Sequence, residues 1–191
     1  MSEGSRLYDA ISIGFGEAGR VLRLMVPIEV TVSTPEMKPV RIEDIPCLLG
    51  SAEKTVVATY SRVRGDISGH LAFLYDPGTA RRLATLVTGE AEPDDEMSAS
   101  AICEVSNVAG SRVLSVLSDA TGLRIVPTAP VLVSDMAGAI LQSTLYDLAP
   151  VGKDAVVTKT EIRLAGEDAA GLMVLIPTGD GVSLLAERLG N

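Results

Sequence analysis

A long interval between similar residues is the feature that most limits how this chain can fold. Four positions of the first 35 residues recur 95 residues later, as the pairs Ser5 and Ser100, Asp9 and Glu104, Ser12 and Asn107, and Pro35 and Pro130. The interval then widens to 102, as small loop insertions would produce, in the pairs Gly69 and Gly171, and Leu83 and Leu185. A repeat this long predicts an internal duplication, with two halves related by pseudo-two-fold symmetry rather than a solenoid.

Hydrophobic periodicity predicts the same order of elements in both halves. The first half is expected to form a helix, a strand, a connector, a hairpin and a helix, over residues 5–25, 27–33, 41–49, 54–75 and 79–87. The second half is expected to repeat them over residues 95–120, 123–128, 135–147, 155–176 and 182–189. Hairpins favour antiparallel pairing. The expected fold class is therefore α/β (α+β), a mostly antiparallel sheet with two long helices packed on it.

Length and composition fit a single domain. The chain has 191 residues, of which 47% are apolar, enough to bury a sizeable core. We expect one domain over residues 1–191, made of two repeats, about 1–89 and 95–191. The acidic stretch 90–96 would join them. Its carboxylates Asp94, Asp95 and Glu96 could hold a divalent metal, but capping of the following helix is the favoured interpretation.

The net charge limits the classes of partner. A formal charge of -9 and a pI near 4.6 argue against nucleic acid and against anionic membranes, because both require clustered Lys and Arg. We find no apolar run of the roughly 18–20 residues that a membrane-spanning helix needs, and no signal peptide. A cytoplasmic location is expected.

Residue types common in catalytic and metal sites are scarce. His70 is the only histidine, which excludes most hydrolytic triads and most zinc sites, and its strand-like surroundings favour a structural or surface role. Cys47 and Cys103 are too few for a disulfide framework and are expected to be buried small hydrophobes. Chemistry on this chain would then depend on carboxylates, amides or hydroxyls.

The second long helix carries a polar face. With 3.6 residues per turn, Ser100, Glu104 and Asn107 fall within about 60° of one another. The opposite face is apolar, and it comprises Ile102, Val105, Ala109, Val113 and Val116. A carboxylate and a carboxamide three residues apart can reach into one small external volume, such as the active site of a partner.

The first helix contains a possible nucleotide-binding fingerprint. Gly14, Gly16 and Gly19 form a G-x-G-x-x-G pattern, which binds dinucleotides when a strand ends and a helix begins at the first glycine. A dinucleotide-binding protein is therefore a remote alternative. Because the repeat places these residues inside a helix, we favour the interpretation that the glycines allow close helix packing.

The spacing Ser100-x3-Glu104-x2-Asn107-x22-Pro130 resembles the signature of the CheC/CheX/FliY-type chemotaxis phosphatases. Length, repeat and strand order are most similar to CheC. The resemblance implies a phosphatase that removes phosphate from the aspartyl-phosphate of a receiver domain of the CheY type. It also implies that Asn107 positions the attacking water, that Glu104 pairs with a lysine of the receiver, and that Ser100 and Pro130 support the motif. No cofactor is expected in this chain, since Mg²⁺ would belong to the receiver.

The first half departs from that signature. Ser5, Asp9, Ser12 and Pro35 keep the spacing, but the Asp9 side chain is one methylene shorter than glutamate. A serine also cannot offer the amide that holds a water against a phosphoryl group. We expect this degenerate second site to be weak or inactive. The competing functional class is a non-catalytic adaptor, since the resemblance also implies a possible CheD-type deamidase partner.

Overall fold

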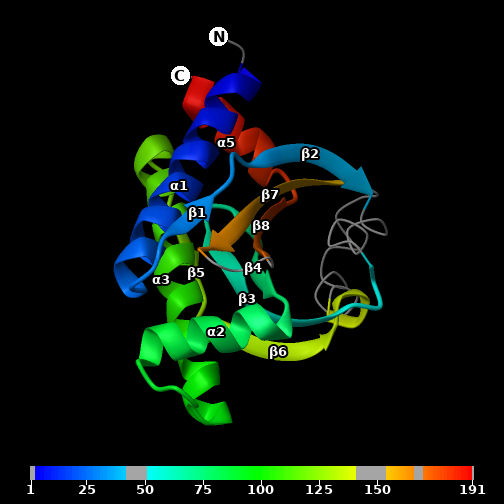
Figure 1. Cartoon of the computed structure of the whole chain (residues 1–191). Coiled ribbons are helices and arrows are strands. Elements are labelled where there is room, and N and C mark those ends of the chain that lie inside the picture. Colours follow the sequence, from blue (N-terminus) through cyan, green and yellow to red (C-terminus); the bar gives the residue numbers. More distant parts are fainter. Residues whose placement is uncertain (1–2, 42–50, 141–153, 166–169, 191) are drawn as a thin grey trace.

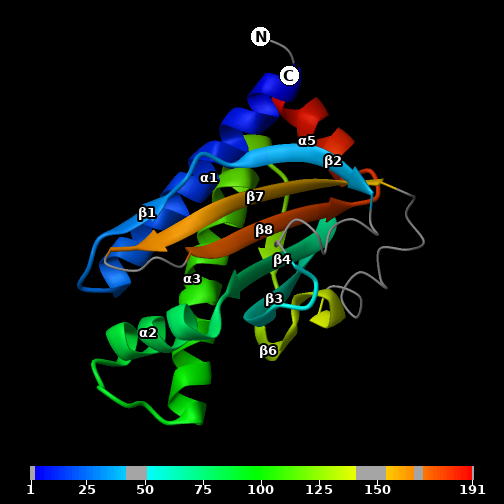
Figure 2. The ribbon, with the colours of Figure 1, turned by 45° about the vertical axis from the view of Figure 1, so that its right-hand side comes forward.

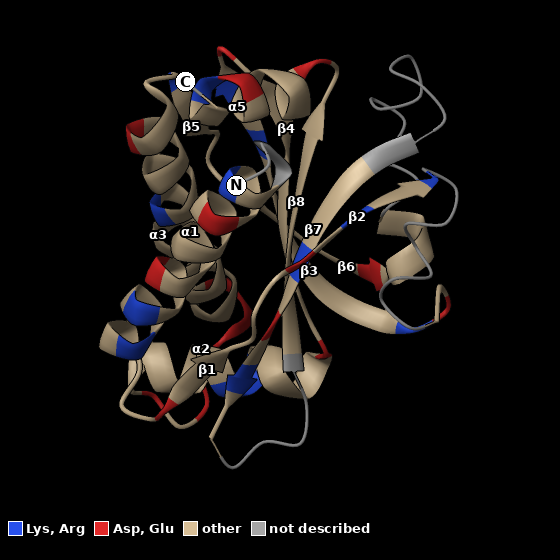
Figure 3. Cartoon of the chain, turned by 90° about the horizontal axis from the view of Figure 1, so that it is seen from above, with Lys and Arg blue, Asp and Glu red and all other residues tan. Residues whose placement is uncertain are grey.

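The computed structural model describes residues 3–41, 51–140, 154–165 and 170–190. Four described helices lie on one side of an eight-stranded sheet, as Figures 1 and 3 show. The helices are α1 (Glu3–Met25), α2 (Pro77–Thr88), α3 (Asp95–Thr121) and α5 (Gly181–Gly190). The strands are β1 (Val30–Val32), β2 (Glu36–Arg41), β3 (Thr55–Gly65), β4 (Ser68–Tyr75), β5 (Ile125–Pro127), β6 (Val131–Met136), β7 (Asp154–Leu164) and β8 (Ala170–Thr178). No described helix is long and apolar enough to span a bilayer.

The element order repeats, because a helix, four strands and a helix occur once in each half. The predicted long helices, hairpins and final helices are confirmed. The strands β2 and β6 were not predicted. Residues 42–50 and 141–147 of the two expected connectors lie outside the described residues. Both missed strands are largely exposed, and β2 contains Pro39, so neither shows the apolar alternation by which strands are found in a sequence.

Each half supplies short strands to the hairpin of the other half. The main path of the sheet runs β1-β7-β8-β4-β3-β5, with β2 also on β7 and β6 also on β3, and every pairing is antiparallel. The first-half strands β1 and β2 thus pair with β7, while the second-half strands β5 and β6 pair with β3. Figure 1 shows β2 and β6 bending away from the helices at opposite edges. This reciprocal pairing fits the predicted pseudo-two-fold symmetry. Its origin in a duplication stays a prediction.

The centre of the sheet has the same symmetry at its glycines. A Cβ added to Gly69 of β4 would lie 2.6 Å from the carbonyl oxygen of Ile176 and 3.0 Å from Cα of Pro177. A Cβ added to Gly171 of β8 would lie 2.6 Å from the ring of Tyr75. Because Pro177 lies 102 residues after Tyr75, the two close approaches are equivalent, and the pseudo-two-fold axis passes between β4 and β8.

Two apolar layers cover the two faces of the sheet. Alternate residues of β4 and β8, such as Phe73 and Met173, pack with α1, α2, α3 and α5 in the main core. The intervening residues, such as Leu74 and Val174, form a smaller cluster on the other face, together with Ile140. Figure 2 shows α1 and α3 lying along the side of the sheet that carries the main core.

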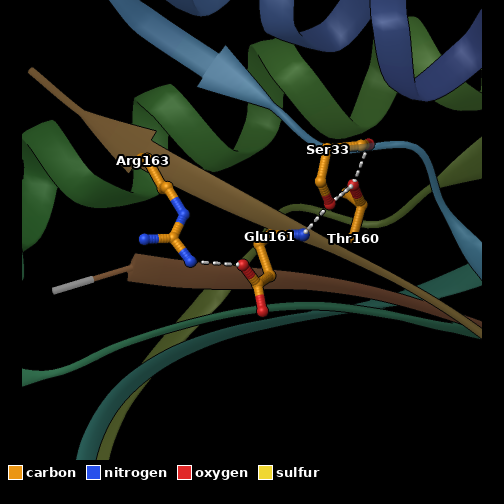
Figure 4. A network of polar contacts seen from close by, with 4 residues as sticks. All are labelled: Ser33, Thr160, Glu161 and Arg163. Atoms are coloured by element: carbon orange, nitrogen blue, oxygen red, sulfur yellow. Dashed lines mark hydrogen bonds and ion pairs between the residues drawn. The ribbon is translucent and has the colours of Figure 1, made fainter.

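A hydroxyl group next to each short strand is hydrogen-bonded to the partner strand, and Figure 4 shows the first of the two, at Ser33. The amide of Ser33 donates to the carbonyl of Glu161 at 2.9 Å, and the amide of Glu161 donates to Oγ of Ser33 at 3.0 Å. Thr128 and Arg62 make the same two bonds in the other half, at 2.8 and 3.0 Å. In Figure 4 the hydroxyl of Thr160 also donates to the carbonyl of Ser33, at 2.5 Å. We call the Ser33–Glu161 and Thr128–Arg62 bond pairs the hydroxyl clips.

The two prolines of the repeat follow these clips. Pro35 lies two residues after Ser33 and directly before β2, and Pro130 lies two residues after Thr128 and directly before β6. Since proline has no amide hydrogen, neither residue can donate a backbone hydrogen bond to a neighbouring strand. Each proline lies between a short strand and the longer strand that follows it.

Candidate functional site

The site is built on α3, whose ends are well defined. The Asp94 carboxylate accepts a hydrogen bond from the amide of Met97 at 2.8 Å and so caps the first turn. Asp95 and Glu96 follow in that turn, where the helix dipole favours negative charge. Gly122 ends the helix with a φ of 68°, a left-handed conformation that glycine adopts without steric cost. The capping interpretation of the acidic linker is confirmed for Asp94.

One side of α3 packs against α1, α2 and the sheet, and 10 of its 27 residues are buried. The predicted apolar face is confirmed for Ile102, Val105, Ala109 and Val113. Val116 is only half-buried, and Leu117 lies in the core instead. The polar face is the stripe of exposed and half-buried residues opposite this apolar face.

The predicted site residues lie along this stripe. Ser100 and Glu104 are exposed, and Asn107 is half-buried one turn further along. Pro130 is half-buried in the connection between β5 and β6, outside the hollow described next. The structure thus places Ser100, Glu104 and Asn107 on one helix face, whereas Pro130 lies apart from them, directly before β6.

An open hollow lies between the C-terminal end of α2 and the first turns of α3. Its volume is about 510 Å³, and we call it the α2–α3 hollow. Figures 1 and 2 show this corner of the molecule, where the start of α3 extends past the sheet next to α2. The lining residues are Val87, Thr88, Asp94, Glu96, Met97, Ser100, Ala101 and Glu104.

Three carboxylates give the α2–α3 hollow a negative rim. Asp94, Glu96 and Glu104 line it, and the described lining includes no Lys or Arg. Its apolar surface includes Met97, which is 43% exposed. Met97 was not singled out from the sequence, although it lies three residues before Ser100, about one helical turn away. The arrangement suits a partner that presents positive charge beside an apolar surface.

The two described residues of the rare types, His70 and Cys103, do not add a catalytic group. His70 is buried in β4 and hydrogen-bonds through Nδ1 with the hydroxyl of Tyr60, which confirms a structural role. Cys103 is half-buried rather than fully buried, and burial raises the pKa of its thiol, which keeps it protonated and weakly nucleophilic. Cys47 lies outside the described residues. Within the described part of the chain, no group of three or more His, Cys, Asp or Glu could hold a metal ion.

The glycine fingerprint does not lie in a nucleotide-binding setting. Gly14, Gly16 and Gly19 all fall inside α1, with no strand ending at the first of them. A Cβ on Gly14 would lie 3.2 Å from the carbonyl oxygen of Val113, and one on Gly19 would lie 2.5 Å from Cγ2 of Val32. The close-packing interpretation is therefore confirmed for Gly14 and Gly19. It is wrong for Gly16, which is exposed with nothing within 4 Å.

The corresponding face of α1 differs from that of α3. Asp9 is exposed and Ser5 is half-buried, but Oγ of Ser12 is buried and has no hydrogen-bond partner among the described residues. Nearby on the helix, Nη1 of Arg6 donates to the last carbonyls of α5. The hydroxyl that stands at the position of Asn107 is thus turned away from solvent.

Comparisons with known proteins agree with this architecture. The family model described as chemotaxis phosphatase CheX matches residues 57–147. The chain is 26% identical to the CheY-P phosphatase CheC of Bacillus subtilis over 187 residues, which covers 94% of this chain and 90% of that protein.

Solved structures share the fold. Thermotoga maritima FliY superposes with a TM-score of 0.75 at 18% identity, covering 98% of this chain and 96% of that one. CheX in the CheX-CheY-BeF3-Mg complex of Borrelia burgdorferi gives a TM-score of 0.60 at 20% identity, covering 87% and 96%. In sequence the chain is thus similar to CheX and CheC, and in fold it is similar to FliY and CheX.

Proposed function

We propose that this protein is a phosphatase that hydrolyses the aspartyl-phosphate of a response-regulator receiver domain of the CheY type. The observation that carries the proposal is the placement of Glu104 and Asn107 together on the face of α3 that lies away from its buried apolar side. Side chains that a fold leaves at such a place can enter the active site of a second protein. A relative named CheY-P phosphatase supports this choice of substrate.

In the proposed reaction a water attacks phosphorus in line with the bond to the aspartyl oxygen. That bond breaks, inorganic phosphate leaves, and the receiver regains its carboxylate. Asn107 would position the water, since its amide offers both an acceptor and donors on a side chain with only two χ angles. Phosphoryl transfer depends mainly on positioning and charge, so a fixed water supplies much of the catalysis. Mg²⁺ would be held by the receiver.

Glu104 would anchor the complex. It is exposed on the same face, one turn before Asn107, and its carboxylate can pair with the receiver lysine that the family resemblance implies. Ser100 lies one further turn back and would contact the edge of the interface. Binding of this kind fixes the distance between Asn107 and the phosphoryl group, on which the rate depends.

We infer that α1 provides no second working site. Asp9 keeps a carboxylate in the right register, but the buried Oγ of Ser12 cannot reach a partner. The protein would therefore carry one competent site. We also propose that it acts in the cytoplasm and consists of one domain made of two repeats.

The test compares two matched substitutions in an assay of receiver dephosphorylation. Asn107→Ala is expected to lower kcat by about 100-fold. Ser12→Ala, its counterpart in α1, should leave kcat unchanged. Wild-type activity in the Asn107→Ala variant would show that the site is wrongly assigned. If catalytic amounts of the wild-type protein do not speed loss of phosphate, while a CheD-type deamidase binds stoichiometrically, the adaptor alternative is correct.

A further inference from the structure

An arginine fills the place in the first half that corresponds to the α2–α3 hollow. Nη1 of Arg6, on α1, donates to the carbonyl oxygens of Leu189 and Gly190 at 3.0 and 2.8 Å. These are the last residues of α5. The final carbonyls of a helix have no intrahelical partner, and the helix dipole favours a cation there. The chain thus contains one example of a guanidinium, on α1, that is bound to the C-terminal end of α5.

The pseudo-symmetry gives the counterparts of these residues. Arg6 corresponds to Ala101 at the interval of 95, while Leu189 and Gly190 correspond to Val87 and Thr88 at the interval of 102. Ala101, Val87 and Thr88 all line the α2–α3 hollow. The hollow is therefore the position at which the second half lacks the arginine side chain of the first.

We propose that the α2–α3 hollow binds a lysine or arginine side chain of the phosphorylated receiver, distinct from the lysine that pairs with Glu104. This inference rests on the proposed function. The helix-end carbonyls of Val87 and Thr88 would accept hydrogen bonds, as those of Leu189 and Gly190 do for Arg6. The carboxylates of Asp94 and Glu96 add negative charge that the Arg6 site does not need, because an incoming side chain must be attracted from solution.

The apolar wall of the hollow fits the same ligand. Lysine and arginine have aliphatic stems that pack on apolar surface while the charged end stays near polar groups. Met97, exposed and flexible, supplies that surface beside the carboxylates. Since Ser100 and Glu104 also line the hollow, it is continuous with the proposed catalytic stripe. A receiver that brings its phosphoryl group next to Asn107 would therefore also cover the hollow.

The first experiment measures binding of a CheY-type receiver that carries Mg²⁺ and beryllium trifluoride in place of the phosphoryl group. Glu96→Gln is compared with Asp95→Asn. Both substitutions remove one carboxylate from the first turn of α3, but only Glu96 lines the hollow. Glu96→Gln should raise the Kd by about 3- to 10-fold at low salt, and less at high salt. Asp95→Asn should leave it nearly unchanged. Equal effects of the two substitutions would overturn the proposal.

The second experiment fills the hollow from within. Ala101→Arg places a side chain where Arg6 lies in the other half, and it should weaken receiver binding by about 10-fold. Arg6→Ala, which empties the α5 side instead, should leave receiver binding unchanged. If Ala101→Arg does not fold, Met97→Ala takes its place as the test. It shortens the apolar wall and should raise the Kd. Wild-type affinity in a folded Ala101→Arg protein would overturn the proposal.

The outcomes separate this inference from the proposed function. If the wild-type protein binds the receiver but releases no phosphate, the phosphatase assignment fails and the Kd series still tests the hollow. If it releases phosphate and the Glu96→Gln and Met97→Ala variants bind like wild type, only the hollow is wrongly assigned. Sedimentation tests a second copy of this chain as occupant, because self-association that these variants abolish would overturn the proposal.

Discussion

The carboxylate of Glu17 on α1 and the guanidinium of Arg112 on α3 form an ion pair at 3.3 Å. The two residues are counterparts at the interval of 95, so the pair forms where the pseudo-two-fold axis passes between the two long helices. Two identical charged side chains would repel each other there, and two identical neutral ones would form no ion pair, whereas Glu and Arg attract each other. The halves have thus become complementary at the position where symmetry brings them together.

The pKa of Glu17 is expected to lie below its usual range. The hydrogen bond from Arg20, at 3.0 Å, is the larger cause, and the bond from Arg112 adds to it. A lowered pKa means that the ionised form stabilises the fold at neutral pH, and that this contribution is lost as the pH falls through the folded-state value. NMR titration of the Glu17 carboxyl should show a higher pKa in Arg20→Ala than in Arg112→Ala. The reverse order would contradict this account.

Two glycines of α1, Gly14 and Gly16, should respond differently to substitution by alanine. Gly16→Ala is expected to raise the free energy of unfolding by about 1 kcal/mol, because the site is open and alanine favours the helix. Gly14→Ala should lower it by about 1–3 kcal/mol, since the new Cβ would press on the backbone of Val113. Urea denaturation measures both. A stabilised Gly14→Ala protein would show that α1 and α3 are not as close as the structure has them.

The hydroxyl clip at Thr128 should contribute measurably to stability. Thr128→Val removes the acceptor of the Arg62 amide and is expected to cost about 1–2 kcal/mol. Thr128→Ser should restore most of this, because Ser33 makes the same bond in the first half. Thermal melts measure the free energies of unfolding of the three proteins. A Thr128→Val protein as stable as wild type would show that the Thr128 clip does not stabilise the fold.

The buried hydroxyl of Ser12 should be a cost to the fold. Ser12→Ala is expected to raise stability by about 1 kcal/mol, since Oγ has no partner among the described residues and alanine is the better helix former. Ser106→Ala serves as the control, because Oγ of Ser106 donates to the carbonyl of Ile102 at 2.9 Å. The gain at position 106 should be smaller. An equal gain at both positions would mean that helix propensity alone explains the change.

Activity should not return to α1 through one substitution. Ser12→Asn places the amide of the signature at a position where the side-chain oxygen is now covered. In an Asn107→Ala background, dephosphorylation by the Ser12→Asn protein is therefore expected to stay at the level of the Asn107→Ala protein alone. Restored phosphate release would show that the face of α1 can open to a receiver.

The parts of the fold that depend on local pattern were predictable. The 3.6-residue spacing on α1 and α3, the Asp94 cap and the Gly122 stop are all readable along the chain. The strands β2 and β6 were not, because they are held by pairing with β7 and β3, which are far away in the sequence. Their exposed and mixed residues carry no apolar alternation of their own.

The candidate site also has one part that could be predicted from the sequence and one part that could not. The stripe of Ser100, Glu104 and Asn107 follows from helix geometry alone, and the structure places these residues as expected. The α2–α3 hollow needed the structure, because Val87 and Thr88 come from another helix. The burial of Oγ of Ser12 also depends on tertiary packing, although the substitution itself was visible in the sequence.

The reciprocal pairing of the short strands has a consequence for how the chain folds during synthesis. The strands β1 and β2 are made early, but their partner β7 begins only at Asp154, so more than 100 residues must be added before they can pair. Closing such distant contacts is slow. Until then the nascent first half has an unpaired strand edge, at which two nascent chains could exchange strands and form a swapped dimer. Slow folding is therefore expected of a sheet in which neither half can complete its strand pairing without the other.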